Sequence, residues 1–154
     1  MKVAIGCDHA GWRLKQEVLE VLTDLGIDYV DVGCSACDKV DFSDYAFPVA
    51  EKVRDAEAER GILICGTGIG MSIAANKVQG IRCALVHDIF SAKMTRLHND
   101  SNVLAMGERV IGPGIAREIA TIWLQTEFEK GRHLKRLNKL TEYEGIRTET
   151  HKEN

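Results

Sequence analysis

A cysteine directly precedes a glycine-rich turn in the middle of the chain, in the sequence GILICGTGIGMSIAANK (61–77). The turn follows neither common nucleotide-binding pattern, because no lysine follows Gly70 and the spacing is G-x-G-x-G rather than G-x-G-x-x-G. A cysteine phosphatase would carry an arginine six residues after its cysteine, where this chain has Met71. The stretch therefore predicts a loop of backbone N–H groups that stabilises negative charge beside a thiol.

The thiol of Cys65 has two interpretations when it is considered alone. A cysteine at the start of a helix ionises more readily than a free one, and a thiolate beside an oxyanion-binding loop suits a nucleophile or a general base. A buried thiol that only packs at the end of a strand fits the residue equally well.

Composition narrows the class of protein. The chain has 154 residues, 45% hydrophobic and 28% charged, which is typical of one soluble globular domain. A net charge of −3 argues against a broad nucleic-acid surface. The first apolar run is too short for a signal peptide, and no run approaches the roughly 18 apolar residues of a membrane span. We therefore expect a cytoplasmic protein that binds neither nucleic acid nor membrane.

Five cysteines are present, and without a secretion signal we expect them to be reduced. Cys34 and Cys37 form a C-x-x-C pair, which would suit a redox pair or half of a zinc site. Only one such pair exists and it follows an apolar run rather than opening a helix, so two loop thiols are the favoured interpretation.

Short apolar runs alternate with longer amphipathic stretches along the whole chain. Helical patterns separate the runs, and the last strong one covers 114–128. The runs predict strands at 3–7, 28–33, 61–66, 82–87 and 102–107. This alternation predicts an α/β fold with a parallel sheet between two helical layers. We expect a single domain over residues 1–145 and a polar, frayed tail over 146–154.

Ligands of open parallel sheets bind outside the carboxyl ends of the strands. This rule places Asp8 with His9, Cys65 with Thr67, and Arg109 at one edge of the predicted sheet. We expect His98 and Asn99 to join them, because they come just before the fifth strand.

Several motifs, taken together, resemble those of the type B ribose-5-phosphate isomerases. That family also includes allose-6-phosphate isomerase and the subunits of galactose-6-phosphate isomerase. The similarity runs from about residue 2 to residue 140, with the motifs in the right order. They are GCDHAG (6–11), ICGTGIGMSIAANK (64–77), GIR (80–82), RLHNDSNVLAMGERVIG (96–112) and GRHLKR (131–136).

The resemblance implies a Rossmann-like, three-layer α/β/α sandwich with a five-stranded parallel sheet. It also implies a homodimer, or a tetramer, whose active sites are each built from both subunits. The implied reaction interconverts ribose 5-phosphate and ribulose 5-phosphate through an enediolate, with no metal and no organic cofactor.

The resemblance further assigns roles to individual residues. Cys65 is implied as the base that moves a proton between carbons 1 and 2, and His98 as the acid and base that opens the sugar ring. Asn99 would hydrogen-bond a sugar oxygen, while Asp8 and Thr67 would hydrogen-bond oxygens 1 and 2. The loop N–H groups that would hold the oxyanion belong to Gly66, Thr67, Gly68, Ile69 and Gly70. A branch of the family that uses a glutamate base carries it where this chain has Met71, so this chain falls in the cysteine branch.

A phosphate group requires charge-assisted donors. Arg132 and Arg136 are four residues apart, hence on one helix face, and their two guanidinium groups can grip one phosphate. A merely solvated basic face is the alternative interpretation of the same run. His9 and Arg109 match further ligand positions of the family, and part of this set would come from the partner subunit. His87, His133 and His151 match no catalytic position, and we expect surface or structural roles for them.

The loop after the second strand departs from the family. It reads CSACDKVDFSDYAFP, with Phe42 where tyrosine is common. Such loops shape the sugar pocket, so allose or galactose 6-phosphate remains an alternative substrate. A non-catalytic sugar-phosphate-binding domain is a further alternative, but we would expect such a domain to have lost Cys65 or His98.

Overall fold

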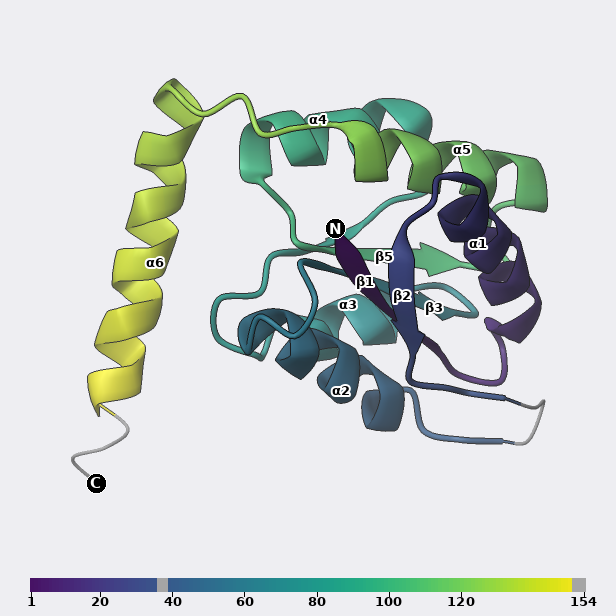
Figure 1. Cartoon of the computed structure of the whole chain (residues 1–154). Helices are drawn as coiled ribbons and strands as arrows, with labels where there is room; N and C mark the ends of the chain where they lie inside the picture. Colours follow the sequence, from purple (N-terminus) through teal and green to yellow (C-terminus); the bar gives the residue numbers. More distant parts are fainter. Residues whose placement is uncertain (36–38, 151–154) are drawn as a thin grey trace.

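The computed structural model describes residues 1–35 and 39–150. Strands and helices alternate along the chain, as the sequence predicts (Figure 1). In chain order they are β1 (Lys2–Cys7), α1 (Trp12–Asp24), β2 (Asp28–Asp31), α2 (Ser43–Arg54), β3 (Arg60–Cys65), α3 (Ile69–Ala75), β4 (Cys83–Leu85), α4 (Ile89–Asn99), β5 (Val103–Gly107), α5 (Pro113–Gln125) and α6 (Arg132–Thr150). Cys37 and His151 lie outside the described residues.

The five strands form one parallel sheet in the order β2-β1-β3-β5-β4. The register pairs Cys7 with Ile64 and Cys65 with Gly107, so β1, β3 and β5 end side by side. We call this edge of the sheet the carboxyl edge, and the edge at which the strands begin the amino edge.

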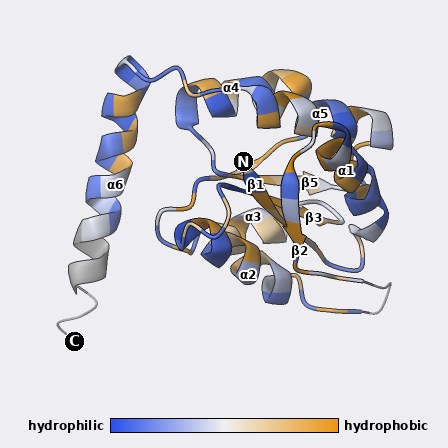
Figure 2. Cartoon of the chain, viewed as in Figure 1, coloured by the Kyte–Doolittle hydropathy of each residue, from blue (hydrophilic) through white to orange (hydrophobic). Residues whose placement is uncertain are grey.

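Helices cover both faces of the sheet. On one face α5 packs between α1 and α4, and on the other face α2 packs on α3. The three central strands are apolar along nearly their whole length, because both of their faces are buried (Figure 2). The predicted three-layer α/β/α sandwich is confirmed.

The last helix differs in its surroundings from the other described helices. α6 stands at the amino edge, away from the layered body, and touches it mainly at the end of α4 (Figure 1). Two residues of α6 face the body. Leu137 is buried, and the Glu144 carboxylate accepts the Gly80 N–H at 3.0 Å. The helix continues to Thr150, so its backbone includes the first residues of the polar tail expected over 146–154. Within the described part of the chain, no helix is both long and apolar enough to span a bilayer.

Candidate active site

Cys65 is the last residue of β3, and its thiol is buried with 6% of the residue exposed. The N–H of Gly68 points at its Sγ at 3.0 Å, a contact that stabilises negative charge on sulfur. Gly68 adopts a φ of 77° as the N-cap of α3, and a Cβ there would lie 2.6 Å from Leu85 and 2.9 Å from the Met106 backbone. Only glycine fits this turn, which explains why the loop must be glycine-rich.

The loop presents backbone donors toward the carboxyl edge. The helical hydrogen bonds of α3 begin at Ser72, whose N–H donates to the Gly68 carbonyl. The N–H groups at the start of a helix lack such acceptors. Here the N–H of Gly68 points at Cys65 Sγ at 3.0 Å, and that of Ile69 is partly occupied by Thr67 Oγ1 at 3.3 Å. Thr67 and Ile69 are exposed, so this donor set is open to a ligand.

The ends of β1 and β5 surround this loop. Arg109 N donates to Gly66 O at 3.0 Å, and the Arg109 side chain lies over Gly66, where a Cβ would be 3.5 Å from Arg109 Cδ. Asp8 is buried at the end of β1, and its Oδ1 accepts the Ala10 N–H at 2.8 Å. His9 Nδ1 accepts the Val40 N–H at 3.3 Å, which leaves Nε2 to donate. We call this set the carboxyl-edge group; its members are Asp8, His9, Gly66, Thr67, Gly68, Ile69, Gly70, Arg109 and Cys65.

Phe42 closes one side of the carboxyl-edge group. Its ring lies against Gly70, where a Cβ would approach three ring carbons at 3.1 Å. The loop singled out by its departure from the family therefore does border the glycine turn.

His98 and Asn99 lie elsewhere, and the expectation that they join Cys65 at one edge is wrong for a single chain. They are the last residues of α4, and the chain then enters β5 at Val103. A residue that precedes a parallel strand lies at its amino end, whereas Cys65 pairs with Gly107 at the far end of β5. The four steps from Val103 to Gly107 alone separate the two positions by about 13 Å (Figure 1).

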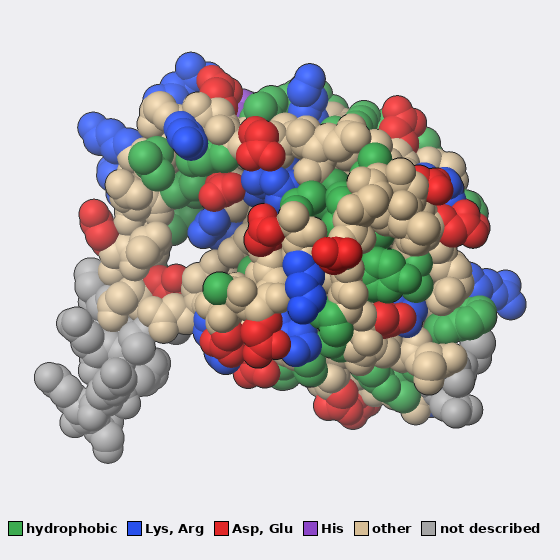
Figure 3. Space-filling view, in the orientation of Figure 1, with side chains coloured by type: hydrophobic (Ala, Val, Ile, Leu, Met, Phe, Trp, Pro, Cys, Tyr) green, Lys and Arg blue, Asp and Glu red, His purple; other side chains and the backbone are tan. Residues whose placement is uncertain are grey.

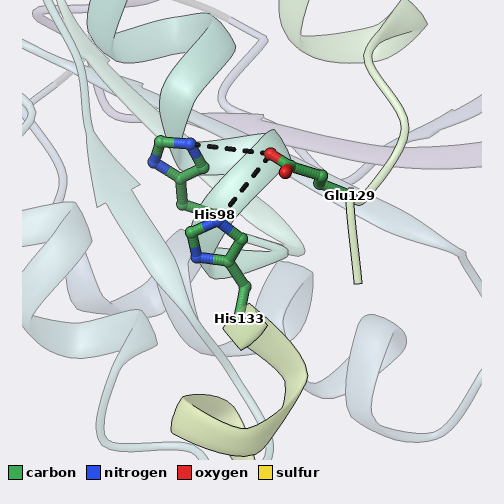
Figure 4. A group of neighbouring side chains, drawn as sticks. All are labelled: His98, Glu129 and His133. Carbon is green, nitrogen blue, oxygen red and sulfur yellow. Dashed lines mark ion pairs between the residues drawn. The ribbon is translucent and has the colours of Figure 1, made fainter. Parts of the chain in front are cut away.

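A second polar cluster forms around His98 at the amino edge. The imidazole of His133 stacks on that of His98 with ring centroids 4.3 Å apart, and the Glu129 carboxylate faces both rings (Figure 4). Arg132 and Arg136 lie exposed on the first two turns of α6, and Arg132 reaches to within 3.9 Å of Glu129. We call His98, Asn99, Glu129, Arg132, His133 and Arg136 the amino-edge group.

Glu129 and His133 are the residues that sequence reasoning missed. For His133 the expectation of a structural role agrees with its burial, 3% exposed, but its stacking partner is the residue assigned to ring opening. The spacing of four residues between Glu129 and His133 placed them within reach of each other. No sequence pattern joined them to His98, which is far away along the chain.

A large cavity adjoins the amino-edge group. It measures about 1060 Å³ and separates α6 from the body, with Gly80, Arg82, Asn99, Leu137 and Tyr143 among its lining residues. In Figure 3 the hollow is visible between α6 and the body. Charged side chains of both signs surround it in this view.

The other sulfur and imidazole groups near the strands have structural surroundings. Burial raises the pKa of Cys7 and that of Cys83 to about 12, which keeps both thiols protonated. His87 accepts the Gly107 N–H through Nε2 at 3.0 Å, and burial lowers its pKa. A neutral His87 thereby fixes the end of β5 next to the loop, in agreement with the structural role expected for it.

Comparisons with known proteins agree with this architecture. Residues 3–140 match the model of a family described as Ribose/Galactose Isomerase. YwlF of Bacillus subtilis (strain 168) is 65% identical over 145 residues, covering 94% of this chain and 97% of that protein. D-erythrulose-4-phosphate isomerase of Pectobacterium atrosepticum is 41% identical, covering 94% and 95%. The structure of Clostridium thermocellum ribose-5-phosphate isomerase B superposes with a TM-score of 0.92 at 47% identity, covering 95% of this chain and 99% of that one.

Proposed function

The chain belongs to the ribose/galactose isomerase family and is an isomerase, and we propose that it interconverts D-ribose 5-phosphate and D-ribulose 5-phosphate. The observation that carries this proposal is the contact between the Gly68 N–H and the Cys65 Sγ, at the entrance of a loop of open backbone donors. A thiolate and an oxyanion-binding loop are the two groups that proton transfer between adjacent carbons requires.

In the proposed mechanism Cys65 removes the proton from carbon 2 of the open-chain aldose. The electron pair moves to oxygen 1, and the enediolate that forms is held by the N–H groups of the α3 turn. The thiol then returns the proton to carbon 1. Asp8 and Thr67 are assigned to oxygens 1 and 2, between which one hydroxyl proton must also move.

Before that step the furanose ring must open, which we assign to His98. An imidazole exchanges protons near neutral pH and suits this step. Asn99 beside it is assigned to a sugar oxygen. Arg132 and Arg136 are assigned to the phosphate, together with His9 and Arg109 of the carboxyl-edge group.

The two groups lie at opposite edges of one sheet, so we propose that a complete site needs two copies of the chain. The carboxyl-edge group of one subunit would meet the amino-edge group of its partner across a twofold axis. Exposed apolar side chains on both sides support this arrangement: Ile69, Ile73 and Leu85 beside the loop, and Leu134, Leu140 and Tyr143 on α6.

The choice of sugar is the finer part of the proposal. A pentose phosphate is favoured by the match to ribose-5-phosphate isomerase B structures over nearly the whole chain. Phe42 packs against Gly70 at the loop and offers no hydroxyl group there. A hexose 6-phosphate, with one more carbon, is the alternative that this side of the pocket would have to accommodate.

The test is to incubate the purified protein separately with ribose 5-phosphate and allose 6-phosphate and to follow ketose formation. Turnover that favours the pentose supports the proposal, and a preference for the hexose would replace the substrate while keeping the mechanism. Binding of both sugar phosphates without turnover of either would contradict the proposed isomerase activity and favour the non-catalytic binding domain.

A further inference from the structure

One buried imidazole nitrogen at the amino edge lacks the partner that buried polar atoms normally have. Among the described residues, Nε2 of His133 is buried and makes no hydrogen bond. It faces Oε2 of Glu129 at 3.7 Å, slightly beyond hydrogen-bond distance. A small movement of this half-exposed carboxylate would satisfy the buried nitrogen.

The same carboxylate oxygen also faces His98. Oε2 of Glu129 lies 3.8 Å from Nε2 of His98, and the two imidazole planes differ by only 13° (Figure 4). One carboxylate thus faces the Nε2 atoms of two stacked rings, of which that of His98 is partly exposed and that of His133 is buried.

The backbone between α5 and α6 fixes this arrangement. Glu129 N donates to Leu97 O at 3.1 Å, which ties the connection to the residue before His98. Lys130 then adopts a φ of 64° and Gly131 a φ of 53°, and the chain turns into α6. A left-handed lysine is unusual and persists where its surroundings impose it. The turn therefore holds both Glu129 and His133 against the imidazole ring of His98.

The charges around the pair leave Glu129 as the counter-ion for His98. Asp100, at the end of α4, is already paired with Arg82 at 3.1 Å and with Arg96 at 2.8 Å. The remaining neighbours that α6 contributes are the cations Arg132 and Arg136. Burial, and then the proximity of His98 and Arg132, lower the pKa of His133, while Glu129 opposes this effect. His133 is thus the neutral ring of the pair.

From this geometry we infer that Glu129 and His133 are positioning residues for ring opening, an inference that rests on the proposed function. The Glu129 carboxylate pairs with the imidazolium of His98. His133 stacks on the His98 ring and orients the Glu129 carboxylate through its Nε2–H.

In ring opening the bond between C1 and O4 breaks and the C1=O1 double bond forms. His98 takes the proton of O1 and delivers one proton to O4, so the net change is one proton moved between two oxygens. Glu129 stays ionised throughout and stabilises the charged form of His98 between the two transfers.

The same three residues could also be considered as metal ligands, because their ligand atoms lie within 4.8 Å of one another. Imidazole lone pairs lie in the ring plane, and two nearly parallel, stacked rings direct them along parallel lines rather than toward one ion. The arrangement therefore suits a shared carboxylate better than a shared metal.

A four-carbon control substrate separates ring opening from isomerisation, because it cannot form the ring. A tetrose phosphorylated on O4 has no free O4 hydroxyl with which to close a five-membered ring, so D-erythrulose 4-phosphate needs isomerisation but no ring opening. Glu129→Gln should lower kcat on ribose 5-phosphate about fivefold, the upper range for a partly exposed charge pair, and leave turnover of the tetrose unchanged. Glu127→Gln is the matched control in the same connection, and it should change neither rate. Equal losses on both substrates would overturn the inference.

His133→Phe keeps a flat buried ring but removes the nitrogen that orients Glu129. It should lower kcat on ribose 5-phosphate about threefold, less than Glu129→Gln does, because the contact between Nε2 and the carboxylate is longer than a hydrogen bond. The double variant should lose no more than Glu129→Gln alone, because both changes act through one carboxylate. Losses that multiply would show that His133 acts independently and would contradict its proposed role.

A measurement without turnover separates this inference from the proposed function. The ring-nitrogen resonances of His98 are recorded by NMR at a fixed pH of about 7, with EDTA present. They should change in Glu129→Gln, which removes the carboxylate that faces Nε2, and stay in place in Glu127→Gln. Unchanged resonances in Glu129→Gln would overturn the inference even in an active enzyme. Changed resonances would support it even if neither sugar phosphate is turned over.

Discussion

The polar groups at the two edges of the sheet are held in place in two different ways. At the carboxyl edge, Cys65 and Asp8 are buried at strand ends and the donors are backbone N–H groups, so the geometry is fixed by the sheet itself. At the amino edge, the groups are side chains of α4, α6 and the turn between α5 and α6, held by stacking and charge. The comparison teaches that rigid strand ends position the proposed base and oxyanion donors. The group proposed for ring opening lies at the end of α4, and two of those proposed for the phosphate lie on α6, a helix that stands away from the body.

The largest expected effect concerns the base at the carboxyl edge. Cys65→Ala should lower kcat about 10²- to 10⁴-fold with little change in KM, because a positioned base contributes that much and substrate binding rests on other groups. Steady-state kinetics on ribose 5-phosphate would measure it. Cys83→Ala removes a protonated thiol elsewhere and should keep normal turnover. A Cys65→Ala enzyme with near-normal turnover would contradict the assignment.

Mixing two inactive variants tests whether the two edges meet between subunits. Cys65→Ala damages one group and His98→Asn the other, so a mixed dimer would contain one site with both defects and one intact site. After unfolding and refolding together, equal amounts should recover about a quarter of wild-type activity, since half of the dimers are mixed and each has one good site. Activity that stays at the level of the separate variants would place both groups of a site in one chain.

The phosphate contacts of the amino edge should appear in KM rather than in kcat. Arg132→Ala removes a charge-assisted donor, which should raise KM for ribose 5-phosphate about tenfold or more. Lys135→Ala, on an exposed position of the same helix, serves as the control. An unchanged KM in Arg132→Ala would remove this residue from the phosphate site.

The smallest expected effect is on the free energy of unfolding, and it concerns the buried His133 of the amino-edge group. The pKa of His133 lies below its ordinary value of 6.5 because burial disfavours the charged form. The unfolded chain therefore binds this proton first, and stability falls as the pH drops below about 6.5. Urea unfolding at pH 7.5 and pH 5.5 should show a smaller loss in His133→Phe than in the wild type. An equal loss in both would mean that other groups, such as His87, account for the pH dependence.

The sequence by itself determined the class of fold and the content of the carboxyl edge. Apolar runs such as 61–66 must be buried on both faces, which requires a parallel sheet between helices, and residues that follow such strands share one edge. The glycine-rich turn after the third strand was also predicted, and the left-handed conformation of Gly68 in the structure explains why glycine is needed there. These rules depend only on residues that are close together in the sequence, so they can be applied without a structure.

Only the tertiary structure decided where His98 lies and what surrounds it. The rule for strand ends applies to residues after a strand, and His98 precedes one, so it lies at the opposite edge from Cys65. Its contacts with Glu129 and His133 depend on how the turn after α5 is tied to α4, a packing event between segments 30 residues apart. Such contacts leave no periodic signal, because they follow from the path of the chain in space rather than from its spacing.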